Sequence, residues 1–183
     1  MTRLFVAVDL PEAVRERTAE LCHGVRGARW TDPDQFHLTL AFLGEVDGPG
    51  FVAARDGLAA VRAEPFELAL AGVGHFPPRG RPRVLWAGLD PSEPLLALHR
   101  RVVSRLERQG LAPERRRYAP HVTLARLQRP ALPDVLAFLA AHGTWRLPPF
   151  PVDAFQLYSS VLGRRGATHR VEASYPLEGA WPG

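Results

Sequence analysis

The chain has 183 residues, enough for one large domain or two small ones. Hydrophobic residues make up 46% and charged residues 23% of the sequence, a composition that supports a substantial core and excludes a disordered chain. The formal net charge at pH 7 is +4, and all 23 basic residues are arginines. A net charge of this size does not by itself identify a nucleic-acid-binding protein.

The N-terminal segment contains a short apolar run that Asp9 and Pro11 interrupt. This run is too short for the core of a signal peptide, and no cleavage-site pattern follows it. No apolar run approaches the ~20 residues that cross a bilayer. The single cysteine, Cys22, excludes an internal disulfide and a cysteine-based zinc cluster. We therefore expect a soluble, cytoplasmic and monomeric protein that has no membrane partner.

The predicted elements of the first half are, in chain order, a strand at 3–9, a helix at 11–23, a strand at 35–43, a helix at 49–63 and a strand at 66–76. The first strand is rich in apolar and β-branched residues, and Pro11 is typical of a first helical turn. Gly44 is expected to end the second strand. The helix after Pro11 presents one apolar face, formed by Val14, Thr18, Leu21 and Cys22.

The second half predicts the same order of elements: a strand at 83–89, a helix at 94–109, a strand at 118–127, a helix at 131–142 and a strand at 150–161. A turn at 163–166 leads to a last strand at about 168–177. The helix at 94–109 carries an apolar stripe formed by Leu95, Leu98, Val102 and Leu106. The β-α-β-α-β order recurs at an offset of roughly 80–84 residues, which indicates a duplicated unit.

These patterns predict an α+β fold in one bilobal domain over residues 1–183. Its pseudo-repeat halves are about 1–78 and 79–167, followed by the last strand. We expect two mainly antiparallel sheets that face a central groove, with the helices on the outside. The Pro- and Gly-rich stretch 74–82 is interpreted as a hairpin loop between the halves rather than as a tether.

The positive charge is concentrated in one segment. Residues 1–78 hold 7 arginines and 11 acidic residues, whereas residues 79–129 hold 12 arginines and 4 acidic residues. Arginine binds phosphate through a planar pair of hydrogen bonds, but arginines on a helix surface are as often only solvated. We expect an asymmetric groove in which the second lobe supplies most of the attraction for phosphate.

One short motif, in which a histidine, an aliphatic residue, a threonine and a leucine follow one another, occurs twice in the chain. The two copies stand 84 residues apart, at the same place in each half. Roughly 0.1 such matches are expected by chance from the composition. Side chains alternate along a strand, so the histidine and threonine of each copy share one face while its aliphatic residues point toward the core. The two copies are His37-Leu38-Thr39-Leu40 and His121-Val122-Thr123-Leu124.

Paired histidines across a groove suit phosphodiester chemistry. One neutral imidazole can act as a general base while a protonated imidazole acts as a general acid. Threonine hydroxyls can donate hydrogen bonds to the phosphate oxygens, and nearby arginines can stabilise the charge of the transition state. A zinc site is the competing use of two histidines, but it requires a third ligand that neither motif contains.

The chain resembles the two-histidine (2H) phosphoesterases. Within this superfamily it is most similar to the bacterial and archaeal RNA 2′,3′-cyclic phosphodiesterases, historically called 2′-5′ RNA ligases. The resemblance covers nearly the whole chain. The stretches that carry it are RLFVAVDLP at 3–11, FHLTLAFLGEV at 36–46, RVLWAGL at 83–89 and PHVTLAR at 120–126.

The resemblance implies hydrolysis of a 2′,3′-cyclic phosphate on RNA or a nucleoside to a 2′-phosphate, without a metal or another cofactor. His37 matches the proton donor to the departing 3′ oxygen, and His121 matches the base that activates water. Thr39, Thr123 and Arg126 match the residues that hold the phosphate. Strand alternation puts Arg126 on the core face, so it reaches the groove only if the strand ends or bulges near Ala125.

Several residues are secondary candidates. Bases stack on aromatic rings, so possible base contacts are Phe76, Trp86, Tyr118 and Tyr158, although packing is the competing interpretation of each. Arg115, Arg116 and Arg117 precede the second motif and are possible RNA contacts, or a solvated loop. Alternation places Phe42 in the core. We expect His75, His99 and His169 to face solvent.

Two alternatives to hydrolysis remain open. The same histidines permit RNA ligation, the reverse reaction that joins a 2′,3′-cyclic end to a 5′-hydroxyl group. A non-catalytic RNA- or nucleotide-binding module would account for the arginines but gives no reason for the paired histidines.

Overall fold

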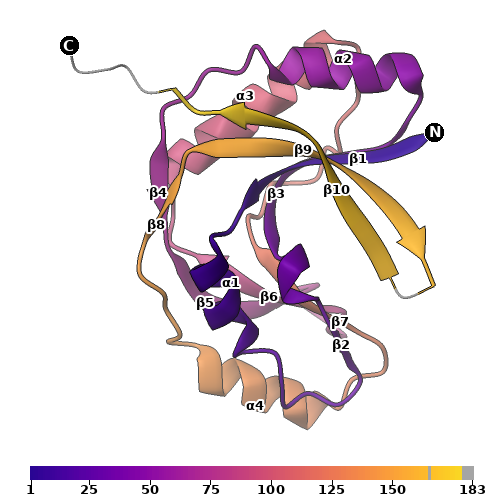
Figure 1. Ribbon diagram of the computed structural model, residues 1–183. Helices are drawn as coiled ribbons and strands as arrows, with labels where there is room; N and C mark the ends of the chain where they lie inside the picture. The colour runs from indigo at the N-terminus through magenta and orange to yellow at the C-terminus, as the bar shows by residue number, and fades with distance from the viewer. Residues whose placement is uncertain (165, 179–183) are drawn as a thin grey trace.

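A computed structural model describes residues 1–164 and 166–178 of the chain (Figure 1). The helices in these residues are α1 (Glu12–Ala19), α2 (Gly48–Leu58), α3 (Glu93–Arg108) and α4 (Leu132–His142), with a 3-10 turn η1 (Pro33–Gln35). The strands are β1 (Thr2–Asp9), β2 (Ala28–Trp30), β3 (His37–Val46), β4 (Phe66–Leu68), β5 (Leu70–Phe76), β6 (Val84–Leu89), β7 (Val122–Leu127), β8 (Phe150–Val152), β9 (Ala154–Gly163) and β10 (Gly166–Pro176). The mixed α+β class is as predicted.

The sheet topology differs from the two separate sheets that we expected. Eight strands form one sheet in the order β10-β9-β1-β3-β7-β6-β5, with β2 paired to β7, and β4 and β8 form a separate two-stranded sheet. Leu38 of β3 pairs with Val122 of β7 and thereby joins the two halves of the large sheet. The strands that carry the two motifs are therefore neighbours at its centre.

The helices α2 and α3 lie at one end of the molecule and α4 lies at the other (Figure 1). The helices α2 and α3 contact each other and β3, while α4 contacts β5. The predicted stripe of α3 is confirmed, since Leu95, Leu98, Val102 and Leu106 are fully buried. Burial of each such side chain contributes about 1.5–3 kcal/mol, which anchors α3 beneath the first motif strand.

Some strand boundaries differ from those that the local sequence pattern predicts. The predicted strands at 66–76 and 150–161 are each divided into two strands that join different sheets. β3 does not end at Gly44, because this glycine adopts a φ of +69° and lies at a β-bulge through which pairing with β1 continues. The segment 74–82 connects β5 and β6 as an antiparallel hairpin, as predicted. None of the helices in the described residues combines the length and the apolar character needed to cross a bilayer.

Candidate active site

The two motifs lie side by side on one face of the sheet. His37 is the first residue of β3, and His121 immediately precedes β7. In the antiparallel pair of Leu38 with Val122, both aliphatic side chains are buried, so the residues on either side of them point to the opposite face. The histidine and the threonine of both motifs therefore share that face, as the alternation predicted.

Each motif histidine is oriented by the same backbone contact. The His37 Nδ1 atom lies 2.7 Å from the carbonyl oxygen of Gln35, and the His121 Nδ1 atom lies 2.7 Å from that of Ala119. A carbonyl oxygen only accepts hydrogen bonds, so each Nδ1 carries a proton and donates it. Each Nε2 is consequently the nitrogen that gains or loses a proton.

The environment of the histidines favours their neutral form. Burial lowers the pKa of His37 to about 4, the contact with the Gln35 carbonyl opposes this shift, and the charges of His169 and His121 add to it. Burial also lowers the pKa of His121, opposed by the Ala119 carbonyl and assisted by the charge of Arg126. Burial therefore favours the neutral form of both imidazoles in the free protein.

A β-bulge turns Arg126 toward the motif threonine of its own strand. Leu85 of β6 pairs with Ala125, but the next residue, Trp86, pairs with Thr123, so one residue of β7 has no counterpart. Ala125 and the preceding Leu124 are both buried, whereas Arg126 is exposed. The condition stated for Arg126 is thus met: the bulge shifts it from the core face to the face of the histidines.

The first motif contains an equivalent bulge. Val6 of β1 pairs with Ala41 and Ala7 pairs with Thr39, so Leu40 is the additional residue. The prediction that Phe42 packs in the core is wrong for this reason: its side chain is 48% exposed, and its ring lies 5.9 Å from that of Phe5. β3 therefore presents a phenyl ring at the position where β7 presents a guanidinium group.

A pocket of about 440 Å³ lies beside His121. Phe76 and Trp86 line it, and the Phe76 ring lies 4.8 Å from the imidazole of His121. A Cβ atom on Gly74 would lie 2.2 Å from the indole of Trp86, so the absence of a side chain there allows the indole to lie close against β5. The indole Nε1 has no hydrogen-bond partner among the described residues.

A second aromatic group surrounds His37. The Phe5 ring lies 4.9 Å from the His37 ring and stacks on Tyr158, whose hydroxyl group donates a hydrogen bond to Asp9. The ring of His169 lies 5.2 Å from that of His37. The prediction that His169 is a surface residue is wrong, because the pairing of β9 with β10 brings it onto the face of the motifs.

Tyr118 and His99 support the first motif from its backbone. Their rings stack with centroids 3.8 Å apart. The Tyr118 hydroxyl donates to the carbonyl oxygen of Thr39 over 2.9 Å, and the His99 Nδ1 atom donates to that of Leu40 over 2.7 Å. Burial raises the pKa of Tyr118, so its hydroxyl group remains a donor. His99 is therefore not solvent-facing, contrary to the prediction. Tyr118 packs on His99 and binds the backbone of the first motif, which its sequence position did not indicate.

The arginines are distributed more widely than expected. Arg115 and Arg116 are exposed and pair with Glu107 and Glu114, and Arg117 is also exposed. Sequence reasoning missed another arginine: Arg29 of β2 pairs directly with Arg126 of β7, so both share one face. The strand β2, which carries Arg29, has only three residues, too few to show a periodic pattern in the sequence. Within the described residues, no group of three His, Cys, Asp or Glu side chains is placed to hold a metal ion.

The sequence profile of the 2′-5′ RNA ligase superfamily matches residues 37–164, which include both motifs. The chain belongs to this superfamily. A Thermus thermophilus protein named RNA 2′,3′-cyclic phosphodiesterase is 37% identical over 97% of this chain and 91% of its own length. The Thermotoga maritima protein of the same name is 31% identical over 97% and 96%. These members of the superfamily are enzymes, and so is this chain.

Solved structures of the superfamily show the same fold. A crystal structure of a Thermus thermophilus protein has a TM-score of 0.78 and 32% identity, and covers 97% of this chain and 99% of that one. E. coli LigT in complex with 3′-AMP has a TM-score of 0.76 and 28% identity over the same shares of both chains. The superfamily fold thus includes the strands of both motifs.

Proposed function

We propose that this enzyme hydrolyses the 2′,3′-cyclic phosphate of an RNA 3′ end or of a nucleoside to a 2′-phosphate. The observation that carries this proposal is the matched orientation of His37 and His121, each held through Nδ1 with Nε2 available. Two equivalent proton-transfer groups on one face suit a reaction that needs one base and one acid on opposite sides of a phosphorus atom. The names and structures of the relatives support the same substrate class.

The proposed reaction transfers two protons. His121 Nε2 accepts a proton from water while the water oxygen forms a bond to phosphorus. The bond between phosphorus and the 3′ oxygen breaks, and that oxygen takes the proton of His37 Nε2 to give a 3′-hydroxyl group. The product is a 2′-phosphate monoester, and proton exchange with solvent restores both histidines.

The free protein holds His37 neutral, so this mechanism requires His37 to take up a proton from solvent when the substrate binds. A cyclic phosphate carries one negative charge, and an anion close to an imidazole raises its pKa. Substrate binding thus supplies the charge that makes His37 an acid. Burial and the charge of Arg126 lower the pKa of His121, which suits it to act as the neutral base.

Three further residues complete the proposed phosphate site. Thr39 and Thr123 make no side-chain hydrogen bond to another described residue, so their hydroxyl groups are available to the non-bridging oxygens. Arg126 reaches the same face through its bulge and can pair with an oxygen whose charge increases in the transition state. The pocket formed by Phe76 and Trp86 is the proposed place for the base.

Product analysis with adenosine 2′,3′-cyclic phosphate tests the proposal. We expect the 2′-phosphate as product, full activity in the presence of EDTA, and a loss of several orders of magnitude in kcat for His37→Ala and for His121→Ala. A 3′-phosphate product would reverse the assigned roles of the two histidines. A single variant with near-wild-type turnover would refute the acid–base pair.

RNA ligation uses the same histidines in reverse and is the second candidate function. Water at its full concentration favours hydrolysis, so we expect ligation only when an RNA 5′-hydroxyl group is held beside the cyclic end. Incubation with paired RNA fragments that bear these two ends distinguishes the reactions by product length.

A further inference from the structure

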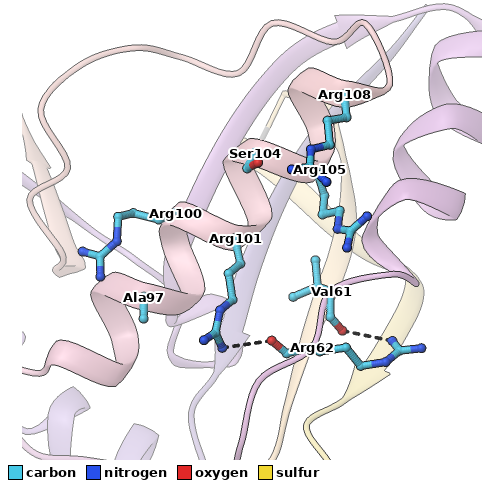
Figure 2. A pocket seen from close by; sticks show the side chains of 8 residues that line it. All are labelled: Val61, Arg62, Ala97, Arg100, Arg101, Ser104, Arg105 and Arg108. Carbon is cyan, nitrogen blue, oxygen red and sulfur yellow. Dashed lines mark hydrogen bonds between the residues drawn. The ribbon is translucent and has the colours of Figure 1, made fainter.

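A second arginine-rich site lies away from the motif histidines. A pocket of about 550 Å³ opens between α3 and the segment that follows α2. Figure 2 shows its lining, with side chains from α3 on one side and Val61 and Arg62 on the other. The pocket contains five arginines and no acidic residue: Arg62, Arg100, Arg101, Arg105 and Arg108.

This site belongs to the outer face of α3. The opposite face of the helix is the buried stripe that includes Leu98 and Val102, and His99 contacts the backbone of Leu40 in β3. Because Leu40 is buried on the side of β3 that the helix covers, the arginines lie beyond the sheet from the catalytic face. The expectation that the arginines of 79–129 gather in the groove is therefore wrong for those of α3.

Four of the five arginines in this pocket lack an acidic partner among the described residues. Arg100 pairs with Glu93, but no ion pair forms at Arg62, Arg101, Arg105 or Arg108. Arg101 and Arg105 stand four residues apart, and like charges at that spacing destabilise a helix by about 0.2–0.5 kcal/mol. An anion bound between them would remove this repulsion.

Backbone contacts hold part of the site in place. The Arg101 guanidinium group donates a hydrogen bond of 2.9 Å to the carbonyl oxygen of Arg62. Arg62 itself bends back and donates to the carbonyl oxygens of Ala59 and Val61. These contacts, two of which Figure 2 draws, hold each guanidinium group against the backbone of this segment while leaving several N–H groups of each unused.

We propose that this pocket binds the phosphate backbone of the RNA body, at a distance from the reacting end. The arginines extend from Arg100 to Arg108, about 12 Å along the helix at 1.5 Å per residue. This length is comparable to the span of a few successive phosphates, whose charges are about 3.4 Å apart along the helix axis for each strand of a duplex. A row of guanidinium groups without base-sized aromatic rings favours backbone contacts over base recognition.

This inference rests on the proposed action at RNA ends. Its test distinguishes a failure of the arginine-rich pocket from a failure of the proposed function. Anisotropy measurements with a labelled 25-nucleotide RNA that ends in a 3′-hydroxyl group report binding without catalysis. We expect Arg101→Glu/Arg105→Glu to raise the Kd about tenfold and to reduce the slope of log Kd against log salt by about 2. Hydrolysis of adenosine 2′,3′-cyclic phosphate by the same variant should stay within twofold of wild type.

The matched control reverses two arginines elsewhere. Arg17 of α1 and Arg55 of α2 are exposed helix residues outside the pocket, and Arg17→Glu/Arg55→Glu changes the net charge equally. An equal loss of RNA affinity in both variants would overturn the site in favour of a general charge effect. Unchanged RNA affinity of the pocket variant would also overturn the proposed site. So would a loss of affinity for a five-nucleotide RNA that equals the loss for the 25-nucleotide RNA. Hydrolysis of the cyclic nucleotide by wild type reports on the proposed function independently.

Discussion

Arg29 of β2 lies directly across from Arg126 of β7, on the face of the sheet that carries the motif histidines. Like charges at opposed positions of an antiparallel pair destabilise it. Within the described residues, neither guanidinium group forms an ion pair. This arrangement is expected where a bound phosphate provides the missing negative charge.

The pairing predicts that Arg29 contributes to substrate binding. We expect Arg29→Ala to lower kcat/KM for an RNA with a 2′,3′-cyclic end by about tenfold, the scale of one charge-assisted hydrogen bond. Most of the change should appear in KM, and Arg29→Lys should recover part of it. Arg17→Ala on α1 is the control, since Arg17 lies on another element and pairs with Glu20. Wild-type kinetics for Arg29→Ala would argue against the role.

The pKa shifts of the two histidines predict an acidic pH dependence. Burial lowers both values below 6.5, and in the proposed mechanism the productive form has His37 protonated and His121 neutral. As pH rises through the higher of the two pKa values, the free enzyme loses the required proton. We therefore expect kcat/KM to decline above a midpoint below pH 6.5, about tenfold per pH unit.

The profile of kcat should extend to higher pH than that of kcat/KM. The bound phosphate anion stabilises the imidazolium form of His37 and raises its pKa in the complex. Steady-state rates with adenosine 2′,3′-cyclic phosphate from pH 4 to pH 9 measure both profiles. An alkaline limb of kcat/KM centred above pH 7 would contradict the environment described for the two histidines.

The close approach of Trp86 to Gly74 predicts the effect of adding one methyl group. Gly74→Ala would place a carbon 2.2 Å from the indole and force it out of its position in the pocket beside His121. We expect a several-fold higher KM for adenosine 2′,3′-cyclic phosphate, with kcat changed less. The control is Gly48→Ala, because a Cβ atom there meets nothing within 4 Å. If both variants gave the same KM, the indole would have no part in binding.

Burial predicts unequal effects of two leucine truncations. Leu98 of α3 is fully buried, whereas Leu136 of α4 is 67% exposed. We expect Leu98→Ala to lower the free energy of unfolding by about 2–5 kcal/mol and Leu136→Ala by less than about 1 kcal/mol. Urea denaturation followed by circular dichroism measures the difference. Similar values for the two variants would show that α3 does not anchor the core.

The sequence by itself determined the elements that have strong periodicity and the residues that the motifs repeat. The apolar stripe of α3 and the shared face of each histidine and threonine followed from fixed side-chain spacings in helices and strands. These patterns are local, so they can be recognised in the sequence without knowledge of strand pairing. The recurrence of His37 and Thr39 at His121 and Thr123 was sufficient to predict that each pair shares one face of its strand.

Only the tertiary structure decided which other residues join the site. A bulge of one residue reverses the side of every residue beyond it, and this turned Arg126 and Phe42 toward the histidines. Arg29 and His169 reach that face through pairing with strands distant in sequence. Hydrogen bonds between strands set the register, and no local pattern of side chains encodes where a bulge will interrupt it.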